Sequence, residues 1–139
     1  MLILDTNVIS ETMQAAPSPR VSEWLAHQQS AELFTTTISM AEILYGIELL
    51  ATGKRRTALL AGAYRMFGKV LFGRILPFDE EAARAFAQIA AERRTRGRPI
   101  AEFDAQIAAI ARSRRATLAT RNTADFEGCG VHLVNPWQG

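Results

Sequence analysis

The sequence predicts an α/β domain with a central, mainly parallel sheet and helices on both sides. Short apolar runs alternate with longer amphipathic segments along the whole chain, which is the order of strands and helices in such a domain. The first run, residues 2–4, has no polar residue, as expected for a strand that is buried on both faces. The length of 139 residues leaves little room for a second unit, and we expect one domain over residues 1–139.

The elements follow in a regular order. The predicted strands are residues 2–4, 32–36, 74–78, 117–120 and 131–134. The predicted helices are residues 21–27, 40–51, 54–72, 79–96 and 101–114. Thr37 or Ser39 is the expected cap of the second helix. Pro77 argues against a central position for the third strand, because proline cannot donate a hydrogen bond to a neighbouring strand.

The composition indicates a globular protein of a reducing compartment. Apolar residues make up 48% of the chain and charged residues 22%, which is enough for a packed core and a solvated surface. Cys129 is the only cysteine, so an intrachain disulfide and a cysteine-based zinc site are both excluded. The first residues contain no basic leader and no long apolar run. We therefore expect a cytoplasmic protein without membrane contact.

The arginines are concentrated towards the end of the chain, although the net charge is only +2. The cluster consists of Arg93, Arg94, Arg96, Arg98, Arg112, Arg114, Arg115 and Arg121. Guanidinium groups present paired donors that match phosphate oxygens, so the cluster can bind nucleic acid. The same residues can equally form a solvated helix end and loop.

Two carboxylates stand where apolar residues are expected. Asp5 follows the most apolar strand at its carboxyl end, the edge where open parallel sheets bind ligands. It can equally cap the turn that follows. Glu42 lies on the apolar stripe of its helix, four residues after Ile38 and seven before Leu49. A buried carboxylate needs a cation, hydrogen-bond donors or a proton, and a salt bridge to arginine is the ordinary solution.

Asp104 repeats this pattern in the first turn of the helix over residues 101–114. It shares the side of Ile107 and Ala108, which should pack on the sheet. The start of this helix and the end of the first strand lie at the same sheet edge, so three carboxylates can converge there. Carboxylates without cysteine or histidine clusters favour Mg²⁺ or Mn²⁺ over zinc. Such a site beside arginines suits phosphodiester hydrolysis by metal-activated water.

The sequence resembles the PIN-domain nucleases and, among them, the VapC-type toxins of the FitB-like branch. The resemblance rests on six segments that occur in the family's order and together span nearly the whole chain. They are LDTNVIS at 4–10, SMAEILYG at 39–46, GRILPFD at 73–79, FDAQIAA at 103–109, TRN at 120–122 and NPW at 135–137.

The resemblance implies a three-layer α/β/α fold with about five strands and four acidic positions at one sheet edge. Asp5, Glu42 and Asp104 match three of these positions, and all three are expected to bind metal. The fourth position holds Asn122, which has no charge, and Asp125 could reach the site instead. These five residues are the expected catalytic set. Thr6 and Thr120 are expected to orient the carboxylates.

The resemblance also implies an activity and partners. The expected protein is an endoribonuclease that uses Mg²⁺, with Mn²⁺ as a possible substitute, and is the toxin of a type II toxin–antitoxin pair. It would form homodimers, cleave RNA and reach DNA only through its antitoxin. Residues 54–72 are a candidate antitoxin groove or dimer face, although an ordinary core-packing helix fits equally well.

Two other functions stay open from the sequence. A catalytically weak or silent binding module, acting through the antitoxin and DNA, is favoured by the missing charge at Asn122. A phosphohydrolase of small esters, with Asp5 as nucleophile, is disfavoured by Asn7, because the second acid of such enzymes is expected there. His27, His132, Trp24 and Trp137 are interpreted as structural residues.

Overall fold

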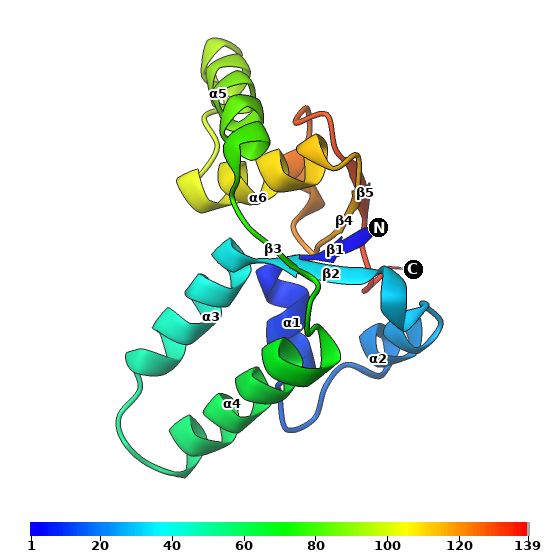
Figure 1. Ribbon diagram of the computed structural model, residues 1–139, viewed down its shortest axis with the longest axis vertical. Helices are drawn as coiled ribbons and strands as arrows, with labels where there is room; N and C mark the ends of the chain where they lie inside the picture. Colours follow the sequence, from blue (N-terminus) through cyan, green and yellow to red (C-terminus); the bar gives the residue numbers. More distant parts are fainter. Residues whose placement is uncertain (139) are drawn as a thin grey trace.

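The protein forms a single five-stranded sheet in which all neighbouring strands are parallel (Figure 1). The computed structural model describes residues 1–138. The strands are β1 (Leu2–Leu4), β2 (Leu33–Thr36), β3 (Ile75–Leu76), β4 (Thr117–Ala119) and β5 (His132–Val134). Their order across the sheet is β3-β2-β1-β4-β5. The predicted parallel sheet is confirmed, and the short β3 lies at its edge, as Pro77 indicated.

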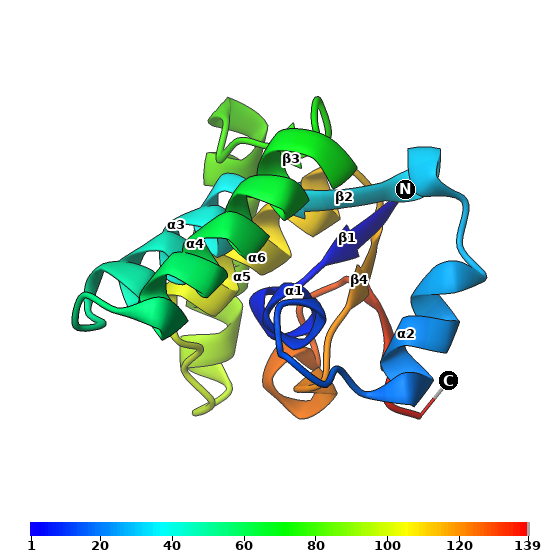
Figure 2. The ribbon, with the colours of Figure 1, turned by 90° about the horizontal axis from the view of Figure 1, so that it is seen from below.

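Helices cover both faces of the sheet. They are α1 (Thr6–Thr12), α2 (Pro19–Ala26), α3 (Thr37–Glu48), α4 (Lys54–Arg65), α5 (Glu80–Thr95) and α6 (Glu102–Ser113). The helices α5 and α6 lie together on one side, whereas α1, α2 and α4 lie on the other (Figures 1 and 2). No helix within residues 1–138 is both long and apolar enough to cross a membrane.

The three layers follow from the alternation of side chains along the central strand. Ile3 and Leu4 are both buried but point to opposite faces, because successive strand residues alternate. Ile3 belongs to the core beneath α5 and α6, with Ile107 and Leu118. Leu4 belongs to the core beneath the other helices, with Val8. The expected three-layer α/β/α architecture is confirmed.

The chain order places a ligand-binding edge at the end of β1. From β1 the chain proceeds to β2 and then β3 on one side, and later returns to β4 and β5 on the other side. The carboxyl end of β1 is therefore the point at which strand order reverses, where open parallel sheets bind ligands. Asp5 is the residue at that end.

The structure differs from the sequence prediction at three places in the helices. Asp5 starts the helix α1, where the sequence indicated only a turn. The predicted cap of α3 is wrong: the helix begins at Thr37, because the side chain of Thr36 accepts a hydrogen bond from the Ser39 amide. The helix expected over 54–72 divides into α4 and a π-helical turn, η2 (Met66–Val70).

Candidate functional site

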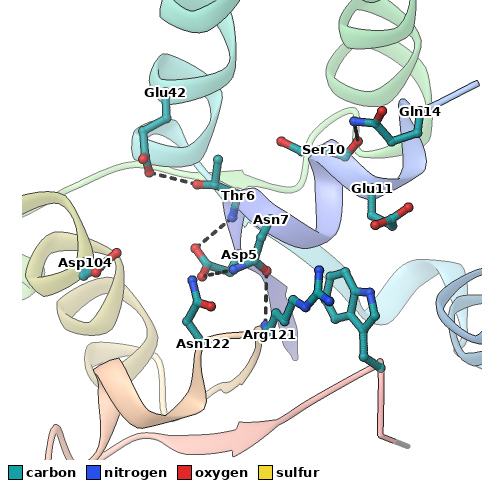
Figure 3. A pocket seen from close by; sticks show the side chains of 11 residues that line it. Asp5, Thr6, Asn7, Ser10, Glu11, Gln14, Glu42, Asp104, Arg121 and Asn122 are labelled. Carbon is teal, nitrogen blue, oxygen red and sulfur yellow. Dashed lines mark hydrogen bonds between the residues drawn. The ribbon is translucent and has the colours of Figure 1, made fainter. Parts of the chain in front are cut away.

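A pocket of about 420 Å³ opens at the carboxyl end of β1 (Figure 3). Asp5 lies at its floor, Glu42 reaches it from α3 and Asp104 from α6 (Figure 3). Asn122, from the loop after β4, completes this part of the wall. The convergence arises because α1, α3 and α6 all begin at the same edge of the sheet, and each carboxylate comes from a residue near that edge.

Asp5 is fixed in the floor of the pocket by hydrogen bonds to both carboxylate oxygens. Its Oδ1 accepts from the Thr6 backbone amide at 2.8 Å, and its Oδ2 accepts from the Thr120 hydroxyl at 2.7 Å and the Asn7 side-chain Nδ2 at 3.3 Å. The side chain is only 4% exposed. Burial raises the pKa of Asp5 above its ordinary value, despite the opposing effect of Thr120 and Thr6. Asp5 therefore caps α1 and also lines the pocket.

Glu42 is half-buried and is held by a hydroxyl group from α1. The Thr6 hydroxyl donates to Glu42 Oε1 at 2.8 Å, and the Ser39 hydroxyl lies 2.9 Å from Thr6 Oγ1. Within residues 1–138 Glu42 forms no ion pair, so the arginine salt bridge that remained open from the sequence is absent there. Burial, followed by the charge of Asp104, raises the pKa of Glu42.

Asp104 lies in the first turn of α6 and faces the pocket from the side opposite Thr6 (Figure 3). Burial raises the pKa of Asp104 to about 6, and the charges of Asp5 and Asp125 contribute to the rise. Like Glu42, it has no cationic partner among residues 1–138. Glu42 and Asp104 thus bring negative charge to the pocket without an ion pair among residues 1–138.

The chemistry of these donors fits a hard divalent cation. No three Asp, Glu, His or Cys side chains within residues 1–138 are close enough to enclose an ion together. Magnesium does not need such an enclosure, because it is commonly held by one or two carboxylates and several waters. Three acids with raised pKa values around an open pocket therefore fit a water-coordinated ion better than a fully enclosed one.

Asn122 and Asp125 occupy different places relative to the pocket. Asn122 lines it, and its backbone amide donates to the Thr120 hydroxyl at 3.1 Å. Asp125 lies in the 3₁₀ turn η3 (Thr123–Phe126), is exposed and does not line the pocket. Its charge still contributes to the raised pKa of Asp5 and of Asp104. At the wall of the pocket, the structure places the amide and not the additional carboxylate.

The arginine cluster is divided between structural and exposed positions. Arg93 is buried, Arg114 pairs with Asp79 at 3.6 Å, and Arg98 pairs with Glu127 at 3.9 Å. Of the cluster, only Arg121 lines the carboxylate pocket. The expectation that the cluster as a whole could hold phosphates is therefore wrong for Arg93, which cannot reach a ligand.

Arg93 holds the loop that follows Asn122. Its Nη1 donates to the carbonyl oxygens of Asp125 at 2.9 Å and Glu127 at 3.2 Å, and its Nε donates to that of Arg98 at 2.8 Å. Replacing Arg93 by Met should lower the free energy of unfolding by roughly 2–3 kcal/mol, because partly buried carbonyl groups lose a charged donor. Urea denaturation measures this loss. Equal stability of the variant and the wild type would show that the loop after Asn122 does not depend on the hydrogen bonds from Arg93.

Comparison with known proteins identifies the family. The model of the PIN domain matches residues 2–128. The chain is 40% identical to "VapC ribonuclease Y4jK" of Sinorhizobium fredii and 39% identical to "Toxin FitB" of Neisseria gonorrhoeae, in each case over 99% of both chains. It is also similar to a chain in "Structure of FitAB bound to IR36 DNA fragment", with a TM-score of 0.91, 39% identity and coverage of 99% and 96% of the two chains. This chain belongs to the PIN-domain family.

Proposed function

We propose that the protein is a Mg²⁺-dependent endoribonuclease and the toxin of a toxin–antitoxin pair. The observation that carries the proposal is a set of three carboxylates at the strand-order reversal of the sheet, Asp5, Glu42 and Asp104, which form no ion pair within residues 1–138. The names of the similar proteins, a VapC ribonuclease and a toxin, support the same reaction and role.

Asp5, Glu42 and Asp104 would together hold a water-coordinated Mg²⁺, with Mn²⁺ as a possible substitute. The bound ion supplies an activated water and stabilises the charge that develops on the phosphate and on the leaving oxygen. Residues of the chain orient two of these carboxylates: the Thr120 hydroxyl and the Thr6 amide donate to Asp5, and the Thr6 hydroxyl donates to Glu42. Loss of a donor of this kind commonly lowers metal affinity or activity by about 10–100-fold.

The direct test is RNA cleavage by purified protein from which any antitoxin has been removed. We expect cleavage of a mixed structured RNA in Mg²⁺ or Mn²⁺, and none in EDTA, with activity restored when Mg²⁺ is added back. Circular dichroism before and after chelation separates metal loss from unfolding. Folded protein that cleaves equally well in EDTA would refute the metal site.

Metal binding should weaken on acidification. The pKa of Asp104 is about 6 and those of Asp5 and Glu42 are raised, so protons compete with the ion for these carboxylates. We expect the Mg²⁺ concentration for half-maximal cleavage to rise as the pH falls from about 7 to about 5, by roughly tenfold for each unit below a pKa of about 6. Cleavage titrated with Mg²⁺ at several pH values measures this. A requirement that is constant over this range would contradict the assignment.

A second pocket supports the antitoxin role. It has a volume of about 620 Å³ and is walled mainly by apolar side chains of α3, α4 and η2, including Leu44, Leu60, Tyr64 and Phe67. Tyr64 is 75% exposed and Phe72 is 73% exposed, and large exposed aromatic residues around a groove are typical of protein interfaces. We assign this groove to an amphipathic segment of the antitoxin. Homodimer formation and DNA contact through the antitoxin belong to the same proposal.

The silent-module alternative rests on Asn122 and makes a distinct prediction. A catalytically silent protein would bind RNA or its antitoxin normally but would cleave nothing in Mg²⁺ or Mn²⁺. The cleavage test above separates the two, since the proposed nuclease requires product formation. The carboxylates at Asp5, Glu42 and Asp104 are all retained and face one pocket, and this favours the active enzyme.

A further inference from the structure

We propose that the guanidinium of Arg121, supported by the indole of Trp137, is a stacking surface for one unpaired base of the RNA. This inference rests on the proposed ribonuclease function and adds a substrate-binding position to it. Arg121 and Trp137 line the same pocket as the carboxylates. A base held there belongs to a nucleotide close to the phosphate that is cleaved.

The two side chains form a cation–π pair. The central carbon of the Arg121 guanidinium lies 5.0 Å from the centroid of the Trp137 ring, over its face. Trp137 is half-buried and packs on the core beside β5, whereas Arg121 is exposed. The indole therefore lies against the guanidinium, and the cation–π attraction limits the motion of the arginine side chain. Because Arg121 is exposed, its guanidinium is still open to a second planar group.

The pair is held in place by hydrogen bonds on both backbone segments. The Asn135 side-chain amide donates to the carbonyl oxygen of Arg121 at 3.4 Å, and the Asn135 Oδ1 accepts from the Trp137 amide at 2.9 Å. One side chain thus ties the loop after β4 to the chain end after β5. On the other side, the Arg121 amide donates to Asn7 Oδ1 at 3.2 Å.

Asn7 connects this pair directly to Asp5 at the floor of the pocket. Its Nδ2 lies 3.3 Å from Asp5 Oδ2 and 3.3 Å from the Thr120 hydroxyl oxygen, while its Oδ1 holds the Arg121 amide. A single side chain therefore links the backbone of Arg121 with Asp5. This cation–π pair is part of the pocket wall, and a shift of the Arg121 backbone would disturb the hydrogen bond between Asn7 and Asp5.

The chemistry of the pair selects an unpaired base. Within residues 1–138 Arg121 has no carboxylate partner, so its charge is available to RNA beside an otherwise acidic pocket. A guanidinium plane stacks on bases, and its edge can donate to phosphate at the same time. Bases inside an A-form helix are not accessible for such stacking, so the site would favour single-stranded loops or ends.

The test combines a substitution in the protein with single base removals in the RNA. Arg121→Lys keeps the charge but removes the plane, and Arg94→Lys makes the same change at an exposed position of α5, outside the pocket. Antitoxin-free protein is titrated into a fluorescent single-stranded RNA in Ca²⁺, and into copies that each lack one base. Cleavage of the same RNAs in Mg²⁺ is measured in parallel, and thermal melting of each variant verifies the fold.

We expect one base removal to weaken binding by wild type and by Arg94→Lys about tenfold, as typical for one lost stacking contact. Arg121→Lys should bind the intact RNA about tenfold more weakly and should be insensitive to that same removal. The inference would be overturned if each base removal changed the RNA affinity of Arg121→Lys as much as it changed that of wild type. So would a variant that binds RNA normally but loses its antitoxin, because the pair would then be a protein contact. If cleavage depended on metal but Arg121→Lys responded to the base removals as wild type does, only the stacking site would be rejected. The ribonuclease proposal would stand.

Discussion

Replacement of Asp104 by Asn is expected to abolish RNA cleavage while making the folded protein more resistant to heat. The variant keeps the shape of the side chain but removes the charge of one of the three proposed metal ligands that line the pocket. If Asp104 binds the ion, the loss of this ligand should lower kcat/KM by about a thousandfold or more, since metal-assisted stabilisation contributes several kcal/mol to the transition state.

The gain in stability follows from the direction of the pKa shift. The pKa of Asp104 is raised from 3.8 to about 6 in the folded protein, so the folded state binds the proton more tightly than the unfolded state. Above pH 6 the ionised carboxylate therefore destabilises the fold, and this cost disappears as the pH falls towards 4. Because the side chain is partly exposed, we expect the neutral amide to contribute on the order of 1 kcal/mol at pH 7, or about 3–5 °C in Tm.

A matched control lies two residues earlier on the same helix. Glu102 is exposed, is also in the first turn of α6 and does not line the carboxylate pocket. Glu102→Gln should leave cleavage within about twofold of wild type. Added Mg²⁺ should raise the Tm of wild type and of Glu102→Gln, but should do so much less for Asp104→Asn, because only a ligand bound to the native state stabilises it. Full cleavage by Asp104→Asn would remove this residue from the proposed site.

The three carboxylates of the pocket could be predicted because each one interrupts or ends an apolar sequence pattern. Asp5 ends an apolar strand, and Glu42 and Asp104 interrupt apolar helix faces. Such conflicts are expected at functional sites, where chemistry overrides packing. The same reasoning could not distinguish capping from function at Asp5, and the structure places both roles on one carboxylate.

The other wall of the pocket could not be predicted from the pattern. Arg121 and Trp137 are separated along the sequence by β5, and only the pairing of β4 with β5 brings them together. Arg93 and Arg121 belong to one cluster in the sequence, yet one is buried beneath a loop and the other faces the pocket. The arginines of the cluster do not recur at a regular spacing that would assign each one to a buried or an exposed face. Only the tertiary contacts show which arginine is buried and which faces the pocket.

Replacing Asn122 by Asp should lower the Mg²⁺ requirement of the enzyme. The side chain lines the pocket together with Asp5 and Asp104, so a carboxylate at this position adds a fourth negative charge near the proposed ion. An added charge several ångströms away in a partly solvated site contributes about 1–3 kcal/mol. We therefore expect the Mg²⁺ concentration for half-maximal cleavage to fall by about 10–100-fold, as measured by cleavage titrations at constant ionic strength.

The same substitution should have the opposite effect when no metal is present. A fourth carboxylate increases the repulsion that already raises the pKa of Asp5 and Asp104, so the Tm of Asn122→Asp in EDTA should fall below that of wild type at pH 7. Asp125→Asn is the matched comparison, since Asp125 contributes charge from outside the pocket lining. It should change the Mg²⁺ requirement by no more than about threefold, consistent with a screened surface charge. If Asp125→Asn instead raised the requirement strongly while Asn122→Asp left it unchanged, the fourth acidic function would belong to Asp125, and η3 would have to bring that carboxylate to the ion.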